Sequence, residues 1–527
     1  MSSDARTLPL RRAPVRDRRM GSWRRRATGQ VQAAERTGAG GLICALALTA
    51  ILLCSLFLVI LVADRPSGLS PITHNNFFPR WMAGPLGGLW PGLTRNGTTL
   101  RYLFTGPVAV MYVSYLLVLT YVRALPARWA VATIVCAHAI FLLAPPLALT
   151  DVFNYVNYGR MEVVHHLNPY TTIPILEPHT DPSYSLSNWH QLLSPYGPLF
   201  TLLTFAVVPL GVAGSFWALK GILVLASLAM ILLVWKCARL LGRDPVAAIV
   251  LVGLNPIVLV WGLGGDHNDF LVLLLIVLGF YLLLRARAAH QEAAAAPAAR
   301  REAQPRLTPA DGSRARLAPM AADIAAGAAF VTAGAIKASA GVMIPVVLAG
   351  LARTPRRLPA VLAGMAGAGL LLAAVSLMAF GLHIPDLSTQ SRLVTNISVP
   401  NLLGLALGSG GETSTLHLVL SVVLVGSIAL CCVQAYRWRD SLTASGWANV
   451  ALLVTLSWVL PWYVLWVLPL AALSSSRRLR AAALGLGVYL IIAWAPASGL
   501  LWSAIGFHPE NTSLGRLHQR YVRELLN

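Results

Sequence analysis

Long apolar runs alternate along this chain with short tracts rich in lysine and arginine. The first run spans residues 41–63, which matches the ~20 residues that a helix needs to cross a bilayer. Of the 527 residues, 56% are hydrophobic and only 12% are charged, so a water-soluble fold would have too few polar residues to cover its surface. The sequence therefore predicts an all-α polytopic membrane protein.

The net charge of +21 would suit a nucleic-acid-binding protein, but the positions of the charges favour another interpretation. Lysine and arginine gather in tracts between apolar runs, such as residues 122–128, as they do in the cytoplasmic loops of membrane proteins. This positive-inside pattern predicts a multi-pass protein of the cell membrane with its N-terminus in the cytoplasm. We expect about thirteen spans, with the C-terminus on the outer side.

The apolar runs fall into two modules. Residues 1–40 are expected to form a disordered basic cytoplasmic tail, followed by an N-terminal transmembrane module over residues 41–284. An Ala-, Arg- and Pro-rich segment, residues 285–318, lacks an apolar period and is predicted to be a disordered cytoplasmic linker. Residues 319–500 then form a C-terminal transmembrane module, and residues 501–527 form an outer tail.

The stretch from residue 150 to residue 200 is unusually polar for so apolar a chain. The alternation of spans places it on the outer face, where we expect a large loop with interfacial helices and the active site. The apolar segment 199–210 is too short to span the bilayer and follows two prolines. We therefore predict that this segment lies along or dips into the outer leaflet.

Asp151 is the sharpest catalytic candidate in this stretch. In a helix over residues 151–164, four side chains share one face: Asp151, Tyr155, Tyr158 and Glu162. A carboxylate at the edge of hydrocarbon loses part of its hydration shell and accepts a proton more readily, as a general base must. Alternatively, Asp151 only caps the helix that it begins, a position that aspartate favours. Both interpretations stay open.

Four cations are candidates for binding a phosphate. Lys220 and Lys337 are lone charges inside apolar segments, and a buried charge in a membrane usually has a partner or a task; snorkelling to the interface is the alternative. Arg392 lies in a predicted outer loop. Arg160 lies on the helix face opposite Asp151, where it would meet either a phosphate or lipid headgroups.

A second polar segment joins two apolar runs: Asp266, His267, Asn268 and Asp269. Glycines alone would suffice for such a hairpin, so this turn is either a polar cap in water or a second contributor to a site on the outer face. The adjacent His165 and His166 do not have metal-ligand spacing, and no compact acidic cluster demands a metal. We predict no metal site, while a requirement for a divalent metal stays open.

The order of several motifs between residues 40 and 500 resembles that of the GT-C glycosyltransferases: DVFNYVNYGRM, NPY, SPYGP, GGDHND and PWY. The resemblance is closer to the polyprenyl-phosphate-mannose-dependent α-1,6-mannosyltransferases of lipomannan and lipoarabinomannan synthesis. It implies that a mannosyl residue passes with inversion from polyprenyl-phosphate mannose to an envelope glycan or lipoglycan. Asp151 would deprotonate the acceptor hydroxyl while the lipid phosphate leaves.

We also expect a set of residues to support the site or contact the acceptor. They are Tyr155, Tyr158, Glu162, Asn168, Tyr170, Tyr196, Asp266, His267, Asn268 and Asp269. Two alternatives to this interpretation stay open. A transporter or flippase would also have many spans and lone intramembrane lysines, and a GT-C enzyme that uses another polyprenyl-phosphate sugar, such as decaprenyl-phosphate arabinose, would have the same layout.

Overall fold

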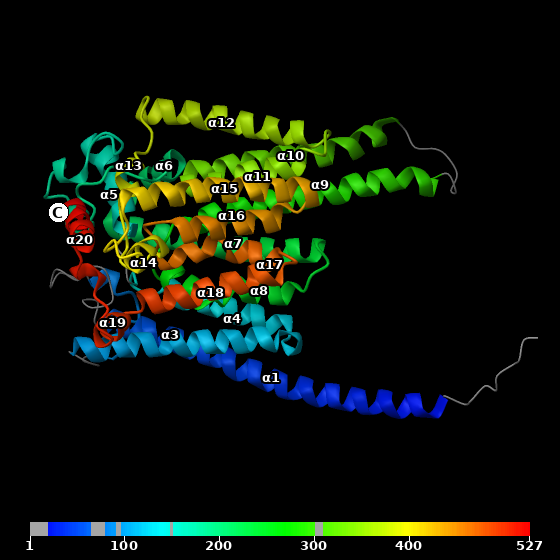
Figure 1. Cartoon of the computed structure of the whole chain (residues 1–527). Helices are drawn as coiled ribbons and strands as arrows, with labels where there is room; N and C mark the ends of the chain where they lie inside the picture. Colours follow the sequence, from blue (N-terminus) through cyan, green and yellow to red (C-terminus); the bar gives the residue numbers. More distant parts are fainter. Residues whose placement is uncertain (1–18, 65–79, 91–95, 148–150, 301–308, 527) are drawn as a thin grey trace, which may run out of the picture.

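The computed structural model describes residues 19–64, 80–90, 96–147, 151–300 and 309–526. Every regular element in these ranges is a helix, and most of the long helices run roughly parallel to one axis (Figure 1). The prediction of an all-α fold is therefore confirmed for the described part of the chain.

The described residues up to position 300 contain fourteen elements. They are α1 (Arg19–Asp64), η1 (Arg80–Met82), α3 (Gly97–Thr120), η2 (Val122–Ala124), α4 (Ala127–Leu142), α5 (Asp151–His165), η3 (Pro174–Leu176), η4 (Tyr184–Leu186), α6 (Pro198–Val207), η5 (Val208–Leu210), α7 (Gly211–Leu240), α8 (Pro245–Gly253), the π-helix η6 (Val258–Leu263) and α9 (Asp269–Arg300).

The second half has the same all-helical character. Its elements are α10 (Pro309–Ile336), η7 (Ala338–Val342), α11 (Met343–Leu351), α12 (Leu358–Phe380), α13 (Ser388–Ser391), α14 (Val399–Ala406), α15 (Ser414–Trp438), α16 (Ser441–Thr455), η8 (Pro461–Trp466), α17 (Leu468–Leu473), α18 (Arg477–Trp494), α19 (Ser498–Ala504), η9 (Pro509–Asn511) and α20 (Ser513–Leu526).

Seven helical segments among the described residues are long and apolar enough to cross a membrane, or eight if α18 and α19 are counted as one bent span. α15 is the most exposed of them, with 6% of its apolar window buried, as expected of a helix that faces lipid. Shorter apolar helices occur at residues 127–142, 338–351 and 461–473. A count of thirteen spans stays a prediction, because it requires such broken segments to cross as well.

Two breaks in the apolar runs have local causes. α8 ends at Asn255-Pro256, where proline lacks the N–H that would continue the helix and the Asn255 carboxamide accepts a hydrogen bond from the Ile257 N–H at 2.9 Å. Between α6 and α7, Gly211 has a left-handed φ of 72°. Across this break the Ser215 hydroxyl donates to the carbonyl of Val207, eight residues earlier, at 2.7 Å.

Helix extends further than the sequence analysis expects in two basic segments. α1 begins at Arg19 and α9 continues to Arg300, whereas the sequence indicates a disordered tail and linker there. Alanine and arginine are strong helix formers, so a missing apolar period does not prevent a helix. The rest of both predictions, residues 1–18 and 301–308, lies outside the described residues.

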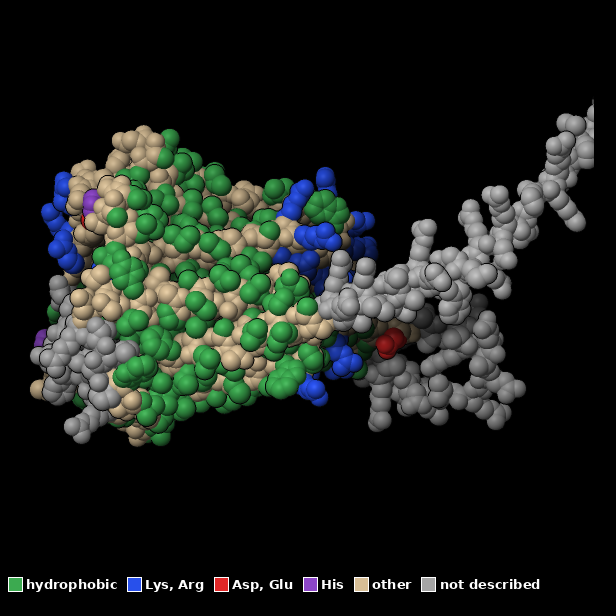
Figure 2. Space-filling model, turned by 90° about the horizontal axis from the view of Figure 1, so that it is seen from below, with side chains coloured by type: hydrophobic (Ala, Val, Ile, Leu, Met, Phe, Trp, Pro, Cys, Tyr) green, Lys and Arg blue, Asp and Glu red, His purple; other side chains and the backbone are tan. Residues whose placement is uncertain are grey.

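The two ends of the helical body differ. α5, α13, α14, α19 and α20 gather at the end where the C-terminus lies (Figure 1), which we call the site end. α20 is tied to the 150–200 loop there, because the Gln191 N–H donates to the Leu525 carbonyl at 3.0 Å. Hydrophobic side chains cover the middle of the face seen in Figure 2, and lysine and arginine gather toward its two ends.

Candidate active site

Asp151 is the first residue of α5 at the site end. Its carboxylate lies 3.4 Å from Nδ1 of His267, and its side chain is 19% exposed, whereas that of His267 is 1% exposed. A carboxylate in the first turn also interacts favourably with the helix dipole. Residues 148–150 lie outside the described part of the chain, so the capping interpretation of Asp151 stays open alongside the general base.

Aromatic rings hold α5 in place next to Asp151. Tyr155 packs edge-on against Tyr196 and Phe200, with ring centroids 4.7 and 4.8 Å apart. Its phenol oxygen accepts a hydrogen bond from the Asn268 N–H at 3.4 Å. Burial, and then the negative charge of Asp151, raise the pKa values of Tyr155 and Tyr196 well above their usual range, so both phenols stay protonated.

The second polar turn is buried against α5. Asp266, His267, Asn268 and Asp269 are each at most 1% exposed, so the interpretation of this turn as a polar cap in water is wrong. Glycine lets this segment fold tightly, because a Cβ at Gly264 would lie 2.2 Å from the carbonyl oxygen of Val260 and 2.3 Å from Cδ1 of Leu147. The structure therefore brings the turn to Asp151.

The two intramembrane lysines are not lone charges, as the sequence suggests. Lys220 is fully buried and donates to Asp266 at 2.8 Å. Lys337 is 19% exposed and donates to both carboxylate oxygens of Asp269 at 3.0 and 2.9 Å. These pairs could not be predicted from local sequence, because each joins residues that are 46 or 68 positions apart. Of the two lysines, Lys337 is the one with a partly exposed side chain.

Several polar atoms around Asp151 have no hydrogen-bond partner among the described residues. They are Oδ2 of Asp266, Nε2 of His267, both amide atoms of Asn268 and Nε1 of Trp462, while Nδ1 of His267 has only its 3.4 Å contact with the Asp151 carboxylate. The His267 ring stacks on Trp462 at a centroid distance of 3.6 Å. Since each unpaired buried polar group costs about 1–3 kcal/mol, this cluster is suited to a polar ligand that would complete its hydrogen bonds. We call it the unpaired cluster.

Aromatic residues of η8 belong to the site although the sequence analysis did not single them out. Trp466 donates to Asp269 at 2.5 Å, and the Lys337 ammonium lies 5.4 Å from the ring centroid of Tyr463 and 5.5 Å from that of Trp466. The signal was the PWY break in an apolar run, since irregular backbone at membrane depth is typical of sites.

Arg160 is engaged within the protein rather than presented to lipid. It forms a two-pronged ion pair with Asp181 through Nε and Nη2, each at 2.9 Å, and His165 also bonds Asp181 at 2.7 Å. Although burial alone would raise the pKa of Asp181, the hydrogen bonds from Arg160, Ser183 and His165 hold it well below its usual range. The interpretation that Arg160 meets lipid headgroups is therefore wrong, because the Asp181 carboxylate of the 150–200 loop pairs with its charge.

Two other acids of the loop have fewer partners. Neither oxygen of Glu177 has a hydrogen-bond partner among the described residues, and burial raises its pKa to about 7 despite the nearby Asn157 amide. Burial also raises the pKa of Glu162. Its Oε2 has no hydrogen-bond partner among the described residues. Both carboxyls therefore hold a proton more tightly than an exposed glutamate does.

Three predicted supporting residues have structural bonds. The Tyr158 phenol donates to the Leu192 carbonyl at 2.8 Å. Asn168 donates to the carbonyl of Phe380, and Tyr170 to that of Tyr196. They fix the 150–200 loop rather than contact the unpaired cluster.

Arg392, which follows α13, is exposed. No group of three His, Cys, Asp or Glu side chains converges within the described ranges.

Comparisons with known proteins give consistent matches. Residues 67–353, more than half of the chain, match the family model of the alpha-(1->6)-mannopyranosyltransferase N-terminal domain. Residues 394–507 match the MptB C-terminal domain. The alpha-(1->6)-mannopyranosyltransferase A of Mycobacterium tuberculosis is 26% identical over 396 residues, covering 69% of each chain.

Two further relatives carry the same kind of name. A second alpha-(1->6)-mannopyranosyltransferase of Mycobacterium tuberculosis is 29% identical over 391 residues, which is 65% of each chain. The alpha-(1->6)-mannopyranosyltransferase A of Corynebacterium glutamicum is 27% identical over 148 residues, which is 26% of this chain and 29% of that protein. No solved structure matches significantly.

Proposed function

The chain belongs to the alpha-(1->6)-mannopyranosyltransferase family, and from this premise we propose that it transfers a mannosyl residue from polyprenyl-phosphate mannose to an envelope glycan or lipoglycan. Membership makes it a multi-pass membrane glycosyltransferase, so the transporter alternative is set aside. The donor, the acceptor, the α-1,6 linkage and inversion at the anomeric carbon are parts of the proposal.

The observation that carries the proposal is the unpaired cluster beside Asp151. A partly exposed carboxylate touches a buried histidine, and the polar atoms behind it lack partners in the described part of the protein. Sugar hydroxyls donate and accept hydrogen bonds, so a mannosyl unit at this point would satisfy Asn268, His267 and the Trp462 N–H. Without a ligand, buried polar atoms that lack hydrogen-bond partners reduce the stability of the folded protein.

In the proposed mechanism Asp151 accepts the proton of the attacking acceptor hydroxyl. The hydroxyl oxygen forms a bond to the anomeric carbon of the donor while the bond from that carbon to the phosphate oxygen breaks, and the lipid phosphate leaves as an anion. One displacement inverts the configuration of that carbon. His267, fixed by its stack on Trp462, would hold the Asp151 carboxylate in position for the proton.

Cations near the site would stabilise the departing phosphate. Lys337 is the better placed lysine, because its ammonium is partly exposed whereas Lys220 is fully buried. The exposed Arg392 at the end of α13 is the second candidate. Asp269 and Trp466 hold the Lys337 ammonium at one position, so it can meet the phosphate without reorganisation.

The proposal places the site on the outer face, and the distribution of charge supports this orientation. The basic tracts at residues 122–128 and 476–480 lie between helices on the end away from α5. By the positive-inside rule that end is cytoplasmic, and the site end then faces outward, where envelope glycans are built.

The test is transfer of radiolabelled mannose from polyprenyl-phosphate mannose to an α-mannoside acceptor by membranes that contain the full chain. Asp151→Asn should lower the rate by about 10²–10⁴-fold, because a general base contributes that much. Linkage and anomeric configuration of the product are read by NMR.

Asp244→Asn is the matched control, because Asp244 caps α8 and accepts from the Val246 and Ala247 N–H groups. It should transfer mannose at nearly the wild-type rate. Transfer by Asp151→Asn at the wild-type rate would remove Asp151 as the base, and wild-type membranes that transfer arabinose but no mannose would reject the proposed donor.

A further inference from the structure

A cavity of about 710 Å³ opens at the site end, apart from the unpaired cluster. Its walls come from the loop before α14, from the end of α18, and from α19, η9 and α20. The residues that matter for its chemistry are Asn396, Trp458, Trp494, Trp502, Gln519 and Arg523. The volume lies within the roughly 300–1,000 Å³ that small-ligand sites occupy.

The lining of this cavity suits a carbohydrate. Indole rings offer flat apolar surface with one N–H donor at the edge, and pyranose rings have matching apolar faces bordered by hydroxyls. The Nε1 groups of Trp494 and Trp502 are buried and have no hydrogen-bond partner in the part of the chain that the structure describes. Asn396, Gln519 and Arg523 place polar groups between the rings, which would be unfavourable for a lipid tail.

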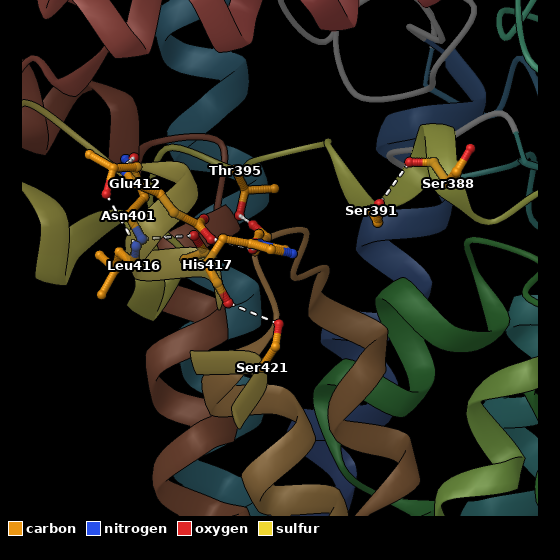
Figure 3. A network of polar contacts seen from close by, with 11 residues as sticks. Ser388, Ser391, Thr395, Asn401, Glu412, Leu416, His417 and Ser421 are labelled. Carbon is orange, nitrogen blue, oxygen red and sulfur yellow. Dashed lines mark hydrogen bonds and ion pairs between the residues drawn. The ribbon is translucent and has the colours of Figure 1, made fainter. Parts of the chain in front are cut away.

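One wall of the cavity is held by a polar network (Figure 3). The buried Glu412 carboxylate accepts from the Ser457 hydroxyl at 2.7 Å, and its backbone N–H donates to the Asn401 amide oxygen at 3.0 Å. Asn401 in turn donates to the Asn396 carbonyl at 2.7 Å, and the Thr395 N–H donates to the Ser457 carbonyl at 2.9 Å. Residues 395 and 396 are therefore fixed before any ligand arrives.

A short series of contacts joins the cavity to the helix that carries Asp151. Asn154, three residues after Asp151 in α5, accepts from the backbone N–H groups of Asn188 and Trp189 at 3.2 and 3.4 Å. The Trp189 ring packs edge-on against Trp458, with centroids 6.1 Å apart. Trp458 lines the cavity, so this ring pair connects the cavity wall to the part of the 150–200 loop that α5 holds.

We propose that this cavity binds the acceptor, as a chain of mannopyranose residues whose growing end extends past Trp189 toward Asp151. The proposal rests on the proposed mannosyl transfer and names where the acceptor lies. It assigns acceptor recognition to residues 394–523 of the second half, while the base lies in the first half. Donor recognition is left with the unpaired cluster and Lys337.

The test measures acceptor binding separately from turnover. Binding of an α-1,6-linked mannooligosaccharide to the purified full chain is followed by saturation-transfer NMR, and KM is measured for donor and acceptor in turn. Trp502→Ala should raise the acceptor dissociation constant and the acceptor KM about tenfold, with donor KM and kcat changed less than about twofold. Trp502→Phe keeps a ring but loses the N–H and should have an intermediate effect.

Two further variants keep the result interpretable. Trp438→Ala at the other end of the bundle, where the ring is 70% exposed, is the matched control and should bind as wild type. If Trp502→Ala does not fold, Gln519→Ala on the surface helix α20 replaces it, with the same expected direction.

The outcomes separate the two proposals. Wild-type binding by Trp502→Ala, Trp502→Phe and Gln519→Ala, together with loss of transfer in Asp151→Asn, would overturn the cavity as acceptor site and leave the function intact. Oligosaccharide binding that depends on Trp502 in a chain that transfers no mannose would support the cavity and overturn the function. Displacement of a bound lipid tail with no glycan binding would also overturn the cavity proposal.

Discussion

Two groups of buried charges on the same helix bundle are built in opposite ways. Toward the end opposite the site end, the carboxylate of Asp323 in α10 accepts hydrogen bonds from Nη2 and Nε of Arg357 at 2.6 and 3.1 Å. Nε2 of His290 lies 3.4 Å from the same carboxylate. Arg357 also donates to the carbonyl of Leu283 at 2.7 Å. Lys337 follows the other end of α10, roughly 20 Å further along at 1.5 Å per residue, and leads into the unpaired cluster.

The difference lies in how many hydrogen bonds the protein completes by itself. Both oxygens of Asp323 have protein partners, so that group joins α9, α10 and α12 and has no capacity left for a ligand. At the site end, one oxygen of Asp266 and all the side-chain polar atoms of Asn268 lack partners among the described residues. A complete network indicates structure, and an incomplete one in so apolar a chain indicates binding.

The largest effect that separates the two groups is on stability. Asp323→Ala leaves the Arg357 guanidinium, which is 13% exposed, without its carboxylate, and breaking a buried pair in this way costs about 3–5 kcal/mol. We expect the purified chain to unfold at a much lower denaturant concentration, with kcat per folded molecule unchanged. A normal stability with a reduced kcat would show that the Asp323 group takes part in catalysis and would end the comparison.

The sequence predicts the fold better than it predicts the ion pairs. Helices form where the apolar runs predict them, for example α1, which contains the run 41–63, because in a bilayer every backbone polar group must be satisfied within the helix. The pairing of Lys220 with Asp266 could not be predicted, because it depends on how α7 packs beside the turn after η6. Burial and exposure are properties of that packing, not of the local sequence.

The same limit applies to the candidate site. Proximity of Asp151 to the GGDHND turn agrees with the alternative that made the turn a second contributor, but no local pattern favours that alternative over a polar cap. Trp462 was missed because a tryptophan in an apolar run is usually lipid-facing or in the core. Its stack on His267 at 3.6 Å appears only when η8 is packed against the turn.

A smaller effect is expected at the site end, on the binding of the donor by Lys337. Lys337→Ala is expected to raise donor KM about tenfold and to leave acceptor KM unchanged, because one charged hydrogen bond to phosphate is worth about 1.5 kcal/mol or more. The substitution also leaves Asp269, which is fully buried, without its cation. Steady-state kinetics with donor and acceptor varied separately measure the split.

The double variant Lys337→Ala, Asp269→Asn distinguishes binding from folding. Removing both charges should restore much of the stability, since no isolated buried charge remains, while donor KM stays raised. An equal loss for donor and acceptor in the single variant, cured in the double variant, would make Lys337 a structural residue like Arg357.

The smallest expected effect concerns two carboxylates of the 150–200 loop. One of them has a complete set of hydrogen-bond partners and the other does not, as in the comparison of the two buried groups. Asp181 is bonded to Arg160, His165 and Ser183, which lowers its pKa, whereas burial raises the pKa of Glu177 to about 7 despite the nearby Asn157 amide. A raised carboxyl pKa means that the folded chain binds the proton more tightly than the unfolded chain does. The stability that Glu177 contributes is therefore present below its unfolded pKa and is lost as the pH rises toward 7.

Glu177→Gln keeps this side chain neutral at every pH, so it should match the wild type at pH 4, below the unfolded pKa, and unfold at a temperature a few degrees higher at pH 8. Thermal unfolding of the purified chain across this range measures the difference, with Glu524→Gln on the exposed side of α20 as the control. A difference that did not change with pH would mean that Glu177 does not titrate in this interval. The incomplete network of the site end would then not extend to the 150–200 loop, and the unpaired atoms would be confined to the cluster around Asp151.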